Sequence, residues 1–226
     1  MSQSRDDKSG VIISSPWLFR IAADAAVATP EPSPTSSMAP GLTAVVFAAA
    51  SVEALINEVA ELADIEVRLG YEDVRLRTFV EAIYGLESSR GSTQLKFVVA
   101  SALLGDRPYQ RGAQPYQDFA LLMSLRNAVM HLKATTIHDV SNGEWRLGAE
   151  TVLEKLRARK LVDPARPHFV TMLLSEASRP QVARWAVNAA AAMALSFISF
   201  FPEPFRTDIL SDQSEVFQPL PDMESR

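Results

Sequence analysis

The stretch that decides the fold is residues 42–70, LTAVVFAAASVEALINEVAELADIEVRLG. Its apolar side chains recur at steps of four and three residues, which is the spacing of one face of an α-helix. These positions are Val45, Ala49, Val52, Ile56, Val59 and Ala63. Glu53, Asn57 and Glu61 follow a separate polar stripe, and Gly70 ends the run. The stretch therefore predicts one long helix with a core face.

Working outward from this helix, the remaining sequence also favours helices. Helical patterns start or stop at proline and glycine in most of the other segments. They cover residues 71–86, 93–104, 115–133, 149–161, 180–201 and a shorter piece at 169–177. We therefore expect an all-α fold, a bundle of about five or six helices.

The two ends of the chain differ in composition from this region. Residues 1–10 are polar, a few large apolar residues follow, and residues 29–41 carry four prolines that favour an extended linker. Residues 202–226 are polar and contain further prolines, so we expect them to pack loosely or not at all. The expected organisation is an extension and linker at 1–41, a helical domain at 42–201 and a tail at 202–226.

Composition excludes several functional classes. A formal net charge of -5 argues against a non-specific nucleic-acid coat, although a local basic pocket for RNA remains compatible. The chain has no cysteine, no histidine pair at metal-ligand spacing and no glycine-rich phosphate loop, so we expect neither a metal nor a cofactor. Residues 185–201 are short and interrupted for a membrane span, so we expect a core helix, no membrane contact and a cytoplasmic protein.

Chemistry-bearing residues gather in the predicted helix at 115–133. Ser124, Asn127 and His131 would share one face of it, whereas Arg126 would stand about 140° away from His131 on an ideal helix. Arginine binds phosphate through paired hydrogen bonds, and histidine transfers protons near neutral pH. Because Arg126 stands apart, a second copy of the chain would most naturally complete the site.

The spacing Arg126-Asn127-x-x-x-His131 resembles the R-x-x-x-x-H signature of the HEPN family, helical domains found in many ribonuclease toxins and defence proteins. The resemblance extends over the helical patterns of residues 42–201. It implies a HEPN-like bundle, metal-independent cleavage of RNA and a homodimer with the site at its interface. It also implies a toxin or defence role, with an antitoxin as a possible partner.

The resemblance further implies a role for each motif residue. His131 would act as general acid or base, Arg126 would stabilise the phosphoryl charge, and Asn127 would orient His131 or bind a phosphate oxygen. Some members carry a tyrosine two residues after the histidine, where this chain has Lys133, so control through a modified tyrosine is not expected. Others carry an acidic residue followed by a Lys-Arg pair on an earlier helix, and the basic residues are missing from the corresponding stretch here.

The possible pocket thus comprises Glu53, Asn57, Ser124 and Lys133, beside the three catalytic candidates. Two other interpretations remain open. The first is a catalytically silent helical module that binds a nucleotide, RNA or a protein partner. The second is a purely structural dimerisation protein, in which Arg126 and His131 only cap or pair helices.

Overall fold

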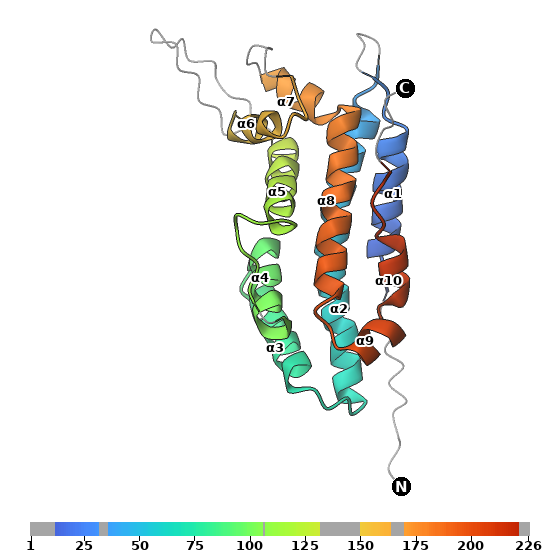
Figure 1. The fold of residues 1–226 in the computed structure, drawn as a ribbon, viewed down its shortest axis with the longest axis vertical. Helices are drawn as coiled ribbons and strands as arrows, with labels where there is room; N and C mark the ends of the chain where they lie inside the picture. The colour runs from blue at the N-terminus through green and yellow to red at the C-terminus, as the bar shows by residue number, and fades with distance from the viewer. Residues whose placement is uncertain (1–11, 32–35, 106, 132–149, 164–169, 222–226) are drawn as a thin grey trace.

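The fold is known from a computed structural model, which describes residues 12–31, 36–105, 107–131, 150–163 and 170–221. This part of the chain contains ten helices and no strand, which confirms the all-α class (Figure 1). Ten helices exceed the five or six expected: seven lie between residues 39 and 198, and three more lie in the regions expected to be an extension and a tail.

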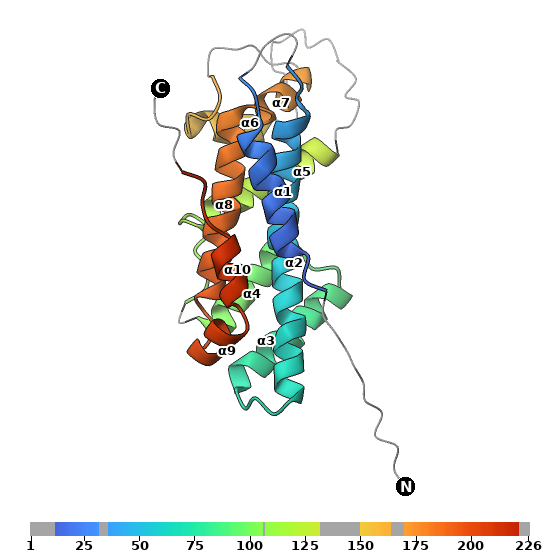
Figure 2. The same ribbon diagram turned by 90° about the vertical axis from the view of Figure 1, so that its right-hand side faces the viewer.

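The long helix predicted at residues 42–70 is α2 (Ala39–Arg68), and it forms the centre of the bundle. It runs beside α8 (Pro180–Ile198), and α1, α3 and α5 also pack on it (Figures 1 and 2). The predicted apolar face, from Val45 to Ala63, is fully buried. The chain leaves α2 through Gly70, whose φ of 100° is accessible to glycine at little cost.

Among the described residues, α2 is the one helix long and apolar enough, by length and composition, to cross a membrane. Half of its most apolar window is buried inside the bundle. The stretch considered from sequence, residues 185–201, lies mostly in α8, which packs against α2, α1 and α5. Both helices thus have protein neighbours along their apolar faces.

The N-terminal region contains a helix that was not predicted, α1 (Ser15–Val27). Its buried side chains, Phe19, Ala22 and Ala26, pack against α2 and α8. Pro16 lies in the first turn of α1, where its missing N–H costs nothing. Part of the expected extension is therefore a member of the bundle.

The described part of the C-terminal tail, residues 202–221, also packs, contrary to expectation. It forms α9 (Glu203–Asp208) and α10 (Ser211–Val216), and it buries Phe205, Leu210 and Phe217. The ring of Phe217 lies 4.6 Å from that of Phe19 on α1, centroid to centroid. The helices α1 and α10 therefore close one side of the bundle together (Figure 2).

The remaining helices follow the sequence prediction closely. They are α3 (Val74–Ser88), α4 (Thr93–Leu104), α5 (Tyr116–Met130), α6 (Glu150–Ala158) and α7 (Val170–Ala177). The side chains of Asp73 and Ser92 cap the first turns of α3 and α4 by accepting from backbone N–H groups. In Figure 2, α5 slants across the bundle behind other helices, and its end emerges at the right-hand edge. The C-terminal end of α5, where the predicted motif lies, is thus at the edge of the bundle.

Candidate functional site

The predicted motif lies at the C-terminal end of α5. Arg126 and Asn127 belong to the last turns of the helix, and His131 is its C-cap residue with φ of -115° and ψ of 35°. The helix therefore ends before Lys133, sooner than expected, and the ideal-helix angle between Arg126 and His131 no longer applies. Lys133 lies outside the described residues.

The end of α5 is open to solvent. Asn127, Met130 and His131 are all exposed, and the His131 backbone N–H donates to the Asn127 carbonyl oxygen at 2.9 Å. Asn127 and His131 thus present an amide and an imidazole at one place on the surface. An exposed imidazole can meet a substrate from solution without any movement of the bundle.

Arg126 has a partner within the same chain. Its guanidinium Nη2 donates to the Oε2 atom of Glu53 on α2. The Arg126 side chain is 23% exposed and the Glu53 side chain 42%, so the pair lies at the rim of the core. The structure therefore brings together two of the predicted site residues that are 73 positions apart in sequence.

Ser124 does not join this pair. Its hydroxyl donates to the Ala120 carbonyl oxygen, one turn back on α5, at 2.8 Å. A hydroxyl that is engaged in its own helix contributes little to a site. Of the predicted pocket residues that the structure describes, Glu53 and Asn57 are the ones that accept a hydrogen bond from a cationic side chain.

Asn57 is paired with a residue that the sequence analysis missed, Lys96 on α4. The Lys96 Nζ atom donates to the Asn57 Oδ1 atom at 2.8 Å and also to the Oε2 atom of Glu87, at the end of α3. Burial lowers the pKa of the Lys96 amine below its usual value, and the negative charge of Glu53 acts in the opposite direction. One signal was available: Lys96 is the single charged residue of the apolar helix α4.

These contacts form one group, which we call the α2 polar cluster: Glu53, Asn57, Glu87, Lys96 and Arg126. Glu53 and Asn57 lie four residues apart on α2, so they share a face and place their two cationic partners about one helical turn apart. Two cations and two carboxylates balance to a formal charge of zero. The cations that face Glu53 and Asn57 therefore come from α5 and α4, not from the residues that follow Glu53 in sequence.

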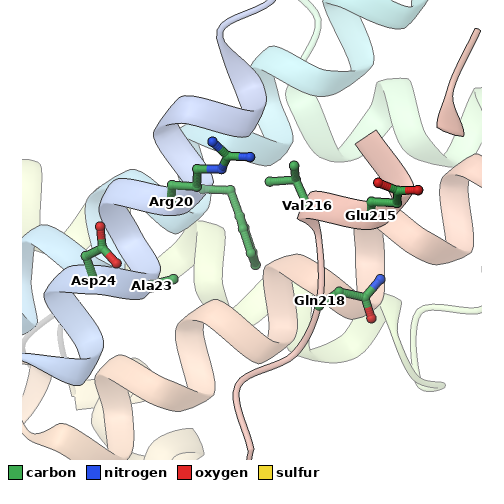
Figure 3. Close-up of a pocket in the computed structure, with 7 residues that line it drawn as sticks. Arg20, Ala23, Asp24, Glu215, Val216 and Gln218 are labelled. Atoms are coloured by element: carbon green, nitrogen blue, oxygen red, sulfur yellow. The ribbon is translucent and has the colours of Figure 1, made fainter. Parts of the chain in front are cut away.

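Other parts of the described chain offer little that competes as a site. No group of three or more histidine, aspartate and glutamate side chains there is arranged to hold a metal ion. An open groove of about 360 Å³ lies between α1 and the end of α10, lined by Arg20, Asp24 and Glu215 among others (Figure 3). None of the predicted site residues contributes to this groove.

Comparisons with known proteins leave the family open. No family model, curated protein or solved structure matches this chain significantly. The end of α5 therefore remains the basis for assigning a function, because Asn127 and His131 are exposed there and Arg126 belongs to the α2 polar cluster.

Proposed function

We propose that the protein is a metal-independent endoribonuclease of HEPN type, with Arg126, Asn127 and His131 as its site. The observation that carries the proposal is the joint exposure of Asn127 and His131 at the end of α5. Arg126 lies in the same helical segment and is held at the rim of the core by Glu53. An imidazole open to solvent and a positioned guanidinium on the same helical segment are two groups that phosphodiester cleavage requires.

The reaction follows from the chemistry of RNA. His131 takes the proton of a ribose 2′-OH, and the 2′-oxygen forms a bond to the adjacent phosphorus. The bond from phosphorus to the 5′-oxygen breaks, and that oxygen receives a proton from a second acid. Arg126 stabilises the charge that gathers on the phosphoryl oxygens, an effect of about 3–4 kcal/mol for one such donor. The attacking oxygen is already adjacent to the phosphorus, so no metal-bound water is needed.

A second copy of the chain supplies the second acid in this proposal. One histidine acts as base and the other as acid, which a two-fold dimer through the α5 ends would allow. A cytoplasmic toxin or defence effector with a cognate antitoxin, and without membrane contact, is the setting proposed for this activity.

One observation favours a second candidate function. The Arg126 guanidinium is already paired with Glu53, as expected for a structural ion pair. A catalytically silent module that binds a nucleotide, RNA or a protein partner would keep this pair and would not need the His131 imidazole. The two candidates differ in the consequence of removing His131.

The first experiment measures cleavage of a broad panel of single-stranded and structured RNAs by purified protein in the presence of a chelator. We expect cleavage by the wild type and its loss in both Arg126→Ala and His131→Ala. Arg77→Ala, which removes an exposed arginine from α3, serves as the matched control and should cut normally. A folded wild type that cuts no RNA of the panel contradicts the proposal and leaves the silent module.

A mixing experiment tests the dimer. The proposed mechanism takes one histidine from each copy, so a hybrid dimer of wild type and His131→Ala has no complete acid–base pair. In an equal mixture after random exchange, only the dimers with two wild-type copies cut RNA, and roughly a quarter of the wild-type activity remains. Sites built within single chains would leave about half of the activity, which would remove the shared-site part of the proposal.

A further inference from the structure

The ion pair between Lys96 and Glu87 is unequal in its exposure. The Lys96 side chain is 5% exposed, whereas that of Glu87 is 63% exposed. The ammonium group therefore lies just beneath the surface, and its carboxylate partner reaches it from the solvent side. Water screens the exposed Glu87 carboxylate, so its attraction for the ammonium is weaker than that of a buried carboxylate.

The Lys96 amine is in contrast fixed in position. It belongs to α4, whose neighbouring Phe97 is buried in the aromatic core, and Asn57 accepts a hydrogen bond from it at 2.8 Å. An ammonium has three N–H donors, and Asn57 and Glu87 are the acceptors found for it among the described residues. A buried cation of this kind is costly unless an anion compensates it.

We infer that Lys96 is a phosphate-binding group, and that Glu87 occupies the phosphate position until a phosphate from solution displaces it. A phosphate carries as much charge as the carboxylate or more, and it offers more acceptor oxygens. The partner of Arg126, Glu53, lies about one helical turn along α2 from Asn57, the partner of Lys96, so a second cation belongs to the same cluster. The two positive groups then face the backbone of a bound nucleic acid.

The exchange also explains how an acidic chain could hold RNA. With both carboxylates in place the α2 polar cluster is formally neutral, so it offers little attraction to anions at long range. Displacement of Glu87 exposes one net positive charge at the point where a phosphate arrives. Phosphate binding at Lys96 stands by itself, whereas the contact with RNA rests on the proposed endoribonuclease function.

The test compares Glu87→Gln with Glu81→Gln, which removes the same charge from another exposed position of α3. The probes are inorganic pyrophosphate and a single-stranded 2′-O-methyl oligonucleotide, whose methylated oxygen prevents cleavage. Dissociation constants are measured at pH 7 without divalent metal. We expect Glu87→Gln to bind both probes about two- to fivefold more tightly than Glu81→Gln, since the competing carboxylate is gone.

Lys96→Met keeps the length of the side chain and removes its charge. We expect it to weaken binding of both probes by about tenfold or more, while circular dichroism shows an intact helical fold. Equal affinities of the two glutamine variants would overturn the inference, as would a folded Lys96→Met that binds like the wild type. Tighter pyrophosphate binding by Glu87→Gln without oligonucleotide binding supports the phosphate site and contradicts the RNA function.

Discussion

Substitution of Glu58 by alanine should detach the start of α1 from the bundle. Glu58 lies on α2 with 9% of its surface exposed, and its carboxylate accepts hydrogen bonds from the backbone and the hydroxyl groups of Ser14 and Ser15. The N-cap residue Ser14 makes no side-chain cap of its own. We call these three residues the α1 clasp, because a carboxylate from another helix satisfies the first N–H groups of α1.

The size of the effect follows from the groups left behind. The Ser15 N–H is buried and loses both carboxylate oxygens, at 3.1 and 3.2 Å, which costs about 1–3 kcal/mol. The loss of a negative charge at a helix N-terminus adds about 0.3–2 kcal/mol. The hydroxyl groups can rotate toward other acceptors, so we expect Glu58→Ala to lower the free energy of unfolding by about 3 kcal/mol. In a chain of this length the melting temperature would fall by about 6–12 °C.

Thermal and urea unfolding measure the global loss, and limited trypsin cleavage after Arg20 reports whether α1 opens locally. Glu81→Ala removes an exposed glutamate from α3 and should change stability by less than about 0.5 kcal/mol. Glu58→Gln preserves the shape but replaces one accepting oxygen by an NH₂ group, which is itself a donor. Four N–H and O–H donors of Ser14 and Ser15 face this side chain, so Glu58→Gln should also destabilise the protein. The reasoning is refuted if Glu58→Ala is as stable as Glu81→Ala, or if Glu58→Gln alone is silent.

Two further predictions concern packing at Gly41 and the pH dependence of stability through Tyr84. Gly41→Ala would drive a Cβ atom into the backbone carbonyl of Ser178, so unfolding experiments should show a loss of about 3 kcal/mol. Gly85→Ala, at an open position near the end of α3, should instead stabilise by about 0.5–1 kcal/mol, and equal effects would contradict the close approach. Burial, followed by the hydrogen bond and charge of Glu61, raises the pKa of Tyr84 to about 12. The wild type should therefore lose stability relative to Tyr84→Phe as the pH rises above 10, and a difference in urea midpoint that is constant from pH 8.5 to 11 would contradict this.

The central helices could be predicted because their signals are local. The bounds of α4 agree with the predicted residues 93–104, since Ser92 caps one end and Gly105 follows the other. The start of α8 at Pro180 and the end of α2 before Gly70 were likewise marked in the sequence. Periodicity and end signals were sufficient for these elements.

The ends of the chain were missed for a physical reason. The buried face of α1 consists of Ser15, Phe19, Ala22 and Ala26, so only one large apolar residue marks it, and its pattern is weak beside the proline-rich stretch that follows. α9 and α10 have six residues each, too few for a periodic signal, and what holds Phe217 is a contact with Phe19 about two hundred positions earlier. Tertiary packing, which no window of sequence contains, stabilises these helices.

Contacts between residues far apart in sequence also limited the prediction of the site. Arg126, Asn127 and His131 could be named because they lie within six residues of one another, and the role given to Glu53 came from a resemblance. Lys96 was not predicted as a site residue because its partner Asn57 is 39 positions away in sequence. Nothing in the sequence around Lys96 indicates that α4 packs near this part of α2. A single charge in an apolar helix is a signal that a buried partner exists, although the sequence does not say which one.

Asn57 and Glu58 show why stability and binding can be separated in this protein. Successive residues of a helix point about 100° apart, so Asn57 faces Lys96 of α4 while Glu58 faces the start of α1. Glu58→Ala should thus lower stability and leave the pyrophosphate affinity of the folded protein unchanged, whereas Lys96→Met should weaken pyrophosphate binding about tenfold or more without opening α1 to trypsin. Weakened pyrophosphate binding in folded Glu58→Ala would mean that α2 transmits strain between its two faces. The α1 clasp and the α2 polar cluster would then have to be treated as one unit.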